Sequence, residues 1–407
     1  MTQMPSIEIN GRRIAAGCPV YVIAELSANH HQNFDDAVHL VCAAKEAGAD
    51  AVKLQTYTPD TITISSDQPC FRIGGGTIWD GETLYDLYAK AYTPWEWQPK
   101  LQQLAGKLGI DLFSSPFDST AVDWLEAMHV PAYKIASFEL TDLALIRRVA
   151  ATGKPVILST GMATLSEIEE AVQAARSAGA KALALLKCTS AYPSPPEEMN
   201  LITIAHLSQA FGVPVGLSDH TLTVSVPVTA VTLGACIIEK HLTLSRGIPG
   251  PDSAFSLDPH EFKAMVEAVR SAQRSLGAVQ YGPTPDEEKS LIFRRSLFVV
   301  QDVRCGEPFS SANIRSIRPG HGLHPRHLDE IIGRTAARDI ERGTPLNWDL
   351  IGPRDLQTPA EASAIASQSR TKSRHPWENK GLDDTETHTY TGEDPDKHPV
   401  TPRQNPV

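Results

Sequence analysis

The sequence of 407 residues predicts an α/β protein built on a (β/α)8 TIM barrel. Eight short, nearly all-apolar segments alternate with amphipathic ones, which is typical of a parallel sheet covered by helices on both faces. Eight is also the strand count of a closed barrel. A doubly wound sheet is the alternative, but no glycine-rich turn follows its first strand, because Gly74, Gly75 and Gly76 fall in a long loop.

The elements follow in order along the chain. A β-hairpin is expected over residues 7–14, with Asn10 and Gly11 at the positive φ angles of a type I′ turn, and we expect it to plug the bottom of the barrel. The expected strands are 20–25, 51–55, 111–114, 132–136, 155–159, 182–187, 214–217 and 236–239. The expected helices include 34–47, 94–108, 119–128, 143–151, 165–177 and 259–276. Left-handed C-caps are expected at Gly48, Gly109, Gly153 and Gly179.

The connection over residues 57–92 is too long for a plain turn. Its aromatic and apolar residues predict partial order. It either leans over the barrel mouth or packs as a surface excursion, and both interpretations stay open.

The chain is expected to divide into a barrel domain (1–282), a linker (283–293), a small β-rich domain (294–352) and a tail (353–407). The tail is polar and rich in proline, serine, threonine and charge. It has too few apolar residues to offset chain entropy, so we expect it to be disordered.

Composition excludes several classes of protein. The net charge of −11 and the lack of a long basic run argue against a nucleic-acid partner. No apolar run approaches the ~20 residues that span a membrane. Residues 1–10 do not resemble a signal peptide, and six cysteines without a CxxC pair indicate a cytoplasmic protein with reduced thiols.

Two lysines at expected strand ends, Lys53 and Lys134, point to a bound anion. Buried lysines are rare because an unpaired ammonium there is costly. The alternative is an ion pair with Glu25, Glu139 or Glu239. A second anion-binding element is a backbone nest at residues 159–161, for which a plain helix N-cap is the alternative.

His220 and His241 follow consecutive strands that would lie ~5 Å apart, so both imidazoles could share one divalent ion. The alternative is that they cap helices or bond to backbone. Side chains alternate between the two faces of a strand, and Lys134 and Ser137 are three residues apart, so they would face opposite sides of one regular strand. The strand that carries Lys134 must therefore end or bulge before Ser137 if both side chains face inward.

Taken together, these motifs identify a resemblance to the sialic acid synthase family over residues 6–352. The segments that carry it are 23–30 (IAELSANH), 53–57 (KLQTY), 113–118 (FSSPFD), 133–139 (YKIASFE), 159–162 (STGM), 187–193 (KCTSAYP), 218–221 (SDHT), 239–241 (EKH), 251–257 (PDSAFSL) and 318–320 (RPG). The tail has no counterpart in the family.

The resemblance implies condensation of phosphoenolpyruvate with an open-chain amino sugar, giving a nine-carbon 2-keto acid and phosphate. It also implies a divalent metal ion (Mn²⁺, Mg²⁺ or Co²⁺), a C-terminal antifreeze-like (SAF) domain and a domain-swapped homodimer. The motifs favour the pseudaminic acid branch, with N-acetylneuraminate and legionaminic acid synthesis as alternatives.

Roles are carried over position by position. His220 and His241 match metal ligands. Phosphoenolpyruvate-binding positions are Lys53, Ser115, Lys134, Ser137, Ser159, Ser190 and Ser218, although the family usually has asparagine at Ser190. Sugar or catalytic positions are Gln55, Phe117, Glu139, Tyr192 and Asp252, with Glu25 beside them, and Arg318 matches an arginine that reaches the partner's sugar site. Glu139 is the candidate for proton transfer.

Two other readings are weighed against this one. A lysine Schiff-base aldolase would use Lys134 or Lys187 and need no metal. A carbohydrate-binding protein would keep the barrel only as an inactive scaffold.

Overall fold

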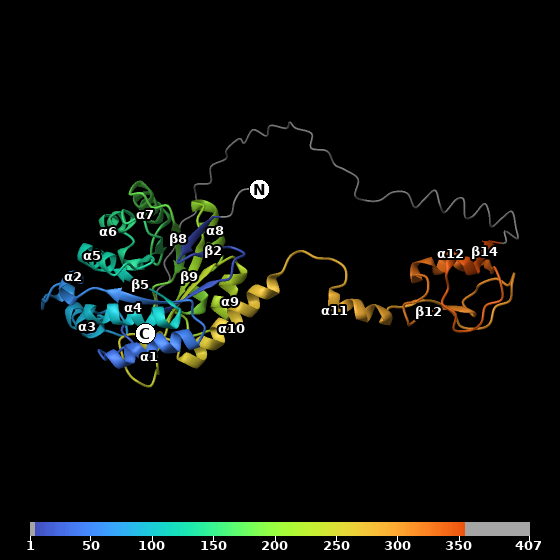
Figure 1. The fold of residues 1–407 in the computed structure, drawn as a ribbon, viewed down its shortest axis with the longest axis horizontal. Helices are drawn as coiled ribbons and strands as arrows, with labels where there is room; N and C mark the ends of the chain where they lie inside the picture. The colour runs from blue at the N-terminus through green and yellow to red at the C-terminus, as the bar shows by residue number, and fades with distance from the viewer. Residues whose placement is uncertain (1–4, 355–407) are drawn as a thin grey trace, which may run out of the picture. The chain divides into compact units, whose positions relative to one another are not determined.

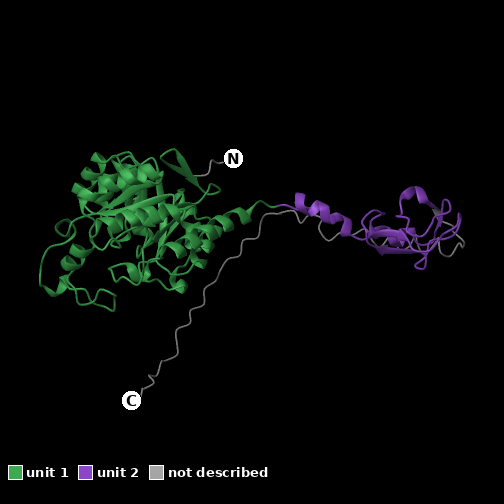
Figure 2. Cartoon of the chain, turned by 60° about the horizontal axis from the view of Figure 1, so that its bottom comes forward, with its two compact units in different colours: residues 1–279 green, residues 280–407 purple. Residues whose placement is uncertain are grey.

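The computed structural model describes residues 5–354 (Figure 1). The chain divides into two compact units, Met1–Val279 and Gln280–Val407 (Figure 2). The predicted disordered tail lies outside the described residues from 355 onward. The first two residues of the predicted tail, Pro353 and Arg354, belong to the last strand, so the second domain extends two residues beyond its predicted boundary.

The first unit contains a closed parallel barrel, which confirms the predicted fold and excludes the doubly wound sheet. Its strands are β3 (Tyr21–Glu25), β4 (Ala51–Thr56), β5 (Asp111–Pro116), β6 (Tyr133–Ile135), β7 (Val156–Ser159), β8 (Leu183–Cys188), β9 (Val215–Asp219) and β10 (Ile237–His241). Strand β10 pairs with both β9 and β3, and this closes the ring.

The strand register brings the predicted polar residues to one level of the barrel. Glu25 is the register partner of both His241 on β10 and Lys53 on β4. Glu239 pairs with Ser218 on β9 in the same way. Because all eight strands are parallel, their carboxyl ends meet on one rim, where barrels of this kind carry their sites.

Eight helices surround the barrel: α1 (Phe34–Glu46), α4 (Gln98–Leu108), α5 (Ser119–Ala127), α6 (Leu143–Ala150), α7 (Leu165–Ser177), α8 (Thr203–Phe211), α9 (Ser225–Thr232) and α10 (Pro259–Leu276). Asn33 is the N-cap of helix α1, and its side chain accepts hydrogen bonds from the Asp35 and Asp36 amides. The four predicted C-cap glycines all have φ between 64° and 100°. Helix α9 consists largely of β-branched residues, which weakens the helical pattern in the sequence.

The N-terminal hairpin closes the opposite end of the barrel. It comprises β1 (Ser6–Ile9) and β2 (Arg12–Ala15), with φ angles of 46° at Asn10 and 76° at Gly11, as the turn prediction requires. Ile9 and Ile14 are buried in the barrel core. The Asn10 amide donates a hydrogen bond of 2.6 Å to Asp111, the first residue of β5.

The second unit has a small hydrophobic core of its own, which includes Leu297, Phe309 and Leu346. Its elements are α11 (Pro285–Glu288), the 3-10 helix Lys289–Phe293, β11 (Ser296–Val299), β12 (Ile314–Ile317), the 3-10 helix Pro325–His327, α12 (Leu328–Ile331), β13 (Arg334–Ala336), the 3-10 helix Trp348–Leu350 and β14 (Ile351–Arg354). The pairs β11–β12 and β13–β14 are antiparallel. The irregular β-rich character expected from the sequence is confirmed.

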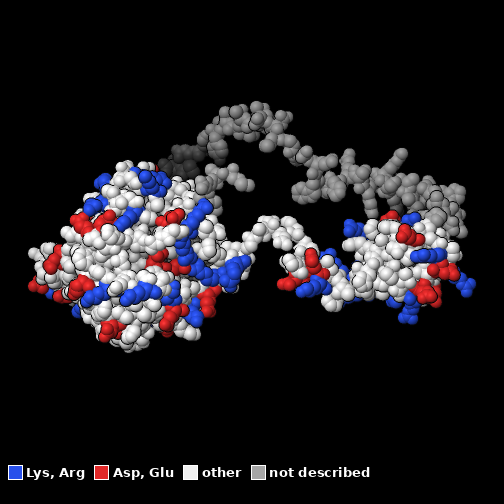
Figure 3. All heavy atoms as spheres, in the orientation of Figure 1, with Lys and Arg blue, Asp and Glu red and all other residues white. Residues whose placement is uncertain are grey.

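Charged side chains of both signs occur on each unit in the face drawn in Figure 3. All six cysteines are free thiols. Of the helices between residues 5 and 354, none has both the length and the apolar character needed to cross a bilayer.

Candidate active site

A cavity of about 500 Å³ opens at the carboxyl ends of the barrel strands. Thirteen of the residues predicted for the site line it: Glu25, Lys53, Gln55, Phe117, Lys134, Ser137, Glu139, Ser159, Tyr192, Ser218, His220, His241 and Asp252. These residues come from all parts of the barrel, from β3 to the segment after β10. The tertiary structure therefore brings most of the predicted set into one place.

Three predicted residues do not line the cavity. Ser115 accepts a hydrogen bond of 3.2 Å from Nζ of Lys53, which does line the cavity. Ser190 Oγ lies 3.9 Å from the Sγ atom of Cys188, which does line the cavity. Arg318 is exposed and follows β12 in the second unit.

The two buried lysines form ion pairs with glutamates, which is the alternative weighed for them, and the bound anion stays a prediction. Lys53 Nζ lies 2.6 Å from Glu25 Oε2 and 3.6 Å from Glu239 Oε1. Lys134 Nζ lies 3.6 Å from the same Glu239 oxygen. Burial lowers the pKa of Lys134 even though Glu239 opposes this. The two lysines and two glutamates balance in formal charge, so the lysines alone leave this part of the cavity without excess positive charge.

Glu139 is the carboxyl group in the cavity best suited to proton transfer. Strand β6 ends at Ile135 and a 3-10 helix, Ser137–Glu139, follows, as the parity of Lys134 and Ser137 requires. The Oε2 atom of Glu139 is buried and has no hydrogen-bond partner. Burial raises its pKa to about 7, although the ammonium groups of Lys134 and Lys53 act in the opposite direction. A carboxyl group with this pKa exchanges protons near neutral pH.

The two histidines meet in the cavity as predicted, with ring centroids 5.3 Å apart. His220 Nδ1 lies 2.9 Å from the Thr189 carbonyl, which can only accept, so this nitrogen carries a hydrogen and Nε2 is left for another contact. His241 Nδ1 is buried without a partner, and burial followed by the charge of His220 holds the His241 pKa well below its usual range. The backbone-bonding alternative therefore describes His220 but not His241.

These two imidazoles fit a divalent ion as a partial ligand set. Among residues 5–354, no group of three or more His, Cys, Asp or Glu side chains forms a complete metal site. An ion held here would therefore take its remaining ligands from water or substrate, as catalytic metal sites commonly do. Asp219 and Lys240, which precede the two histidines in the chain, form a fully buried ion pair at 2.7 Å that ties β9 to β10.

Both interpretations of residues 159–161 are wrong. The Thr160 amide donates to the Leu186 carbonyl, and the Gly161 amide donates to Ser137 Oγ at 3.1 Å, so neither is free to form a nest. The N-cap of α7 is Thr164 instead. The Ser159 hydroxyl is buried, lines the cavity and has no partner, which leaves it available to a ligand.

The connection over residues 57–92 leans over the barrel mouth, in agreement with one of the two predictions. It contains α2 (Pro59–Ile62), a 3-10 helix (Pro69–Phe71) and α3 (Leu84–Ala91). Trp79 lines the cavity and donates from Nε1 to the Pro251 carbonyl at 2.8 Å. Its ring lies 5.6 Å from that of Tyr192 by centroid.

Sequence reasoning missed several residues of the cavity wall, among them Tyr57, Trp79, Tyr88 and Phe255. Tyr57 and Phe255 lie in two of the segments that carry the resemblance, 53–57 and 251–257, and the signal for Trp79 and Tyr88 was the density of aromatic residues in the long connection. Asp252 was predicted, but not its partner Ser27, whose hydroxyl donates a hydrogen bond to it. Burial raises the pKa of Asp252 against the effect of this bond.

The fold and the cavity define a TIM-barrel protein with a polar site at the carboxyl ends of its strands and a small β-rich second domain. Family models match both parts: the NeuB family over residues 40–281 and the SAF domain over residues 294–352. The chain belongs to the NeuB family.

Named relatives cover most of the chain. The pseudaminic acid synthase of Helicobacter pylori is 48% identical over 332 residues, which is 81% of this chain and 97% of the relative. The N,N'-diacetyllegionaminic acid synthase of Legionella pneumophila is 35% identical over 336 residues, 81% of this chain and 94% of the relative. The crystal structure of N-acetylneuraminic acid synthetase from Leptospira borgpetersenii has a TM-score of 0.63 at 29% identity and covers 72% of this chain and 97% of that chain.

Proposed function

We propose that this protein condenses phosphoenolpyruvate with 2,4-diacetamido-2,4,6-trideoxy-L-altrose to give pseudaminic acid and phosphate. The observation that carries the proposal is the meeting of two buried lysines, an unpartnered carboxyl group and an unpartnered imidazole in one cavity. The 48% identity to a pseudaminic acid synthase supports this choice of sugar, since the legionaminic acid relative is only 35% identical.

Phosphoenolpyruvate would bind at the lysine side of the cavity. Lys53 and Lys134 would contact its phosphate and carboxylate, and hydroxyl donors would come from Ser115, Ser137, Ser159, Ser190 and Ser218. Ser159 supports this assignment most directly, because its buried hydroxyl has no partner within the protein.

His220 and His241 would hold the divalent ion (Mn²⁺, Mg²⁺ or Co²⁺), which when bound supplies Lewis-acid activation of the sugar carbonyl. The charge balance of the cavity supports such an ion. Glu25 and Glu239 already neutralise Lys53 and Lys134, so a trianionic substrate needs positive charge beyond the lysines.

In the proposed reaction, C3 of phosphoenolpyruvate forms a bond to the aldehyde carbon of the sugar. Water then adds at C2, and the tetrahedral adduct loses phosphate. Glu139 would take the proton from the attacking water or return one to the new alkoxide, because its pKa of about 7 allows both directions near neutral pH. Glu25 lies beside the sugar position, where it accepts a hydrogen bond of 2.9 Å from Gln55 Nε2.

The sugar would contact Gln55, Phe117, Tyr192 and Asp252. Arg318 would complete the site from the SAF domain of a second copy in a domain-swapped homodimer. Three exposed apolar side chains after β6 and β7 support such a contact at the barrel mouth: Phe138, Met162 and Leu165, which are 60%, 61% and 52% exposed. A cytoplasmic location is part of the proposal and agrees with the free thiols.

The test is release of phosphate from phosphoenolpyruvate with a panel of sugars, with and without a chelator. The panel holds the diacetamido-trideoxy altrose, its mannose-configured counterpart and N-acetylmannosamine. Release with the altrose alone, abolished by the chelator, supports the proposal. Release with another sugar moves the chain to the legionaminic or N-acetylneuraminic branch. Chelator-insensitive release with borohydride trapping of a lysine supports an aldolase, and a folded protein that releases nothing supports the binding-protein reading.

A further inference from the structure

Helix α3 (Leu84–Ala91) turns its apolar face toward the cavity instead of the barrel core. Leu84, Leu87, Tyr88 and Ala91 recur at helical spacing, and all four line the cavity. None of the four is fully buried, and none belongs to the hydrophobic core of the barrel. An apolar face left half-covered over a cavity indicates a ligand with apolar groups of its own.

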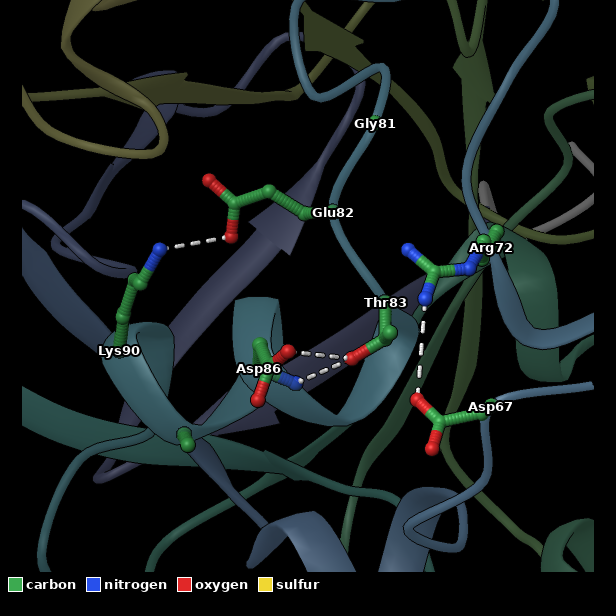
Figure 4. A pocket seen from close by; sticks show the side chains of 8 residues that line it. Asp67, Arg72, Gly81, Glu82, Thr83, Asp86 and Lys90 are labelled. Carbon is green, nitrogen blue, oxygen red and sulfur yellow. Dashed lines mark hydrogen bonds and ion pairs between the residues drawn. The ribbon is translucent and has the colours of Figure 1, made fainter.

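The opposite face of α3 carries charged and polar side chains that are paired with one another. Figure 4 shows the groove on this side, where Lys90 Nζ pairs with Glu82 at 2.8 Å and the Thr83 hydroxyl contacts Asp86. Arg72 and Asp67 pair at 3.7 Å beside them. These side chains are mostly exposed and bonded to each other, so the groove offers no built site. The contrast between the two faces makes α3 an amphipathic wall of the cavity.

Aromatic rings extend this wall toward the reacting centre. Trp79 lies 5.6 Å from Tyr192, and Tyr192 lies 4.5 Å from His220 by ring centroid. Tyr57 and Tyr88 meet at 5.6 Å on the other side. The polar floor at the strand ends must receive the carbonyl end of the sugar, so the far end of an open-chain sugar points to α3.

We propose that the apolar face of α3, with Trp79, selects a sugar that carries a C6 methyl group and acetamido groups in place of hydroxyls. This inference rests on the proposed function and specifies which groups of the sugar the site recognises. The wall contacts the methyl carbons of these groups. It distinguishes deoxy-diacetamido sugars from hydroxylated ones such as N-acetylmannosamine, and it does not distinguish the altrose from the mannose configuration.

The test compares kcat/KM for the diacetamido-trideoxy altrose and for N-acetylmannosamine in wild type, Leu87→Asn and the outer-face control Lys90→Gln. We expect a wild-type preference for the deoxy sugar of about 100-fold, the usual scale for an added hydroxyl in an apolar pocket. Leu87→Asn should reduce this preference at least ~10-fold and leave the KM for phosphoenolpyruvate unchanged. Lys90→Gln should match wild type in both quantities.

A binding measurement that needs no turnover separates this inference from the proposed function. In saturation-transfer NMR with chelator present, the C6 and acetamido methyl protons of the deoxy sugar should receive the strongest signals, and Leu87→Asn should weaken them. Equal signals along the sugar would refute selection of the sugar by helix α3. An unchanged kcat/KM preference between the two sugars in Leu87→Asn would refute it as well. A wall that instead contacts a second copy of the chain would make Leu87→Asn change the mass in solution, and this also overturns the proposal. Methyl saturation without phosphate release refutes only the proposed function.

Discussion

Replacing Glu139 with glutamine should remove turnover and make the protein more stable at alkaline pH. Burial raises the pKa of this carboxyl from 4.5 to about 7, so the folded state binds its proton more tightly than the unfolded chain. The resulting contribution to stability is fully present below pH 4.5 and is lost as the pH rises through about 7.

The expected magnitude follows from these two pKa values. Between pH 5 and pH 8, ionisation of Glu139 should cost the wild type about 2–3 kcal/mol of unfolding free energy that Glu139→Gln does not lose. The new amide also lacks a partner where Oε2 has none, but this cost is the same at both pH values and cancels in the change between them. For turnover, the deprotonated fraction of the wild-type carboxyl falls about 10-fold between pH 8 and pH 6.

The assay is chemical denaturation of both proteins at pH 5 and pH 8 with chelator present, together with the pH profile of phosphate release. Glu170→Gln, the same change at an exposed position of α7, is the matched control and should resemble wild type throughout. If Glu139→Gln keeps its turnover, the proton-transfer role is wrong. If its stability declines with pH in parallel with wild type, the buried-carboxyl reasoning is wrong.

Three further predictions concern the surroundings of the site. Lys240→Met leaves Asp219 buried and unpaired, so it should lower the unfolding free energy by about 3–5 kcal/mol in denaturant titrations; a near-neutral result contradicts this. Gly161→Ala places a methyl group against the hydroxyls of Ser190 and Ser137, so the KM for phosphoenolpyruvate should rise by the equivalent of about 1–3 kcal/mol; an unchanged KM shows that the serines can move aside. Wild type should gain about 3 kcal/mol of stability in Mn²⁺ at 100 times its dissociation constant, and His241→Ala should lose this gain; equal stabilisation of both proteins argues against this ligand.

The alternation of strands and helices was readable from the sequence because each strand is buried on both faces and each helix on one. The hairpin turn at Asn10 and the glycine C-caps were equally readable, since they depend only on local backbone conformation. Helices α8 and α9 are not among the helices named from the sequence, and in α9 the β-branched residues obscure the helical period.

The identities of the polar residues at the strand ends were determined by the sequence alone, because parallel strands that close a ring must bring those ends together. Their partners were decided by the tertiary structure. The ion pairs of both lysines with Glu239 and the hydrogen bond from Trp79 to Pro251 join residues that are far apart in the chain. The unpartnered oxygen of Glu139 is likewise a result of burial in the folded protein. Desolvation and charge pairing depend on distances in space, and no sequence pattern records these distances.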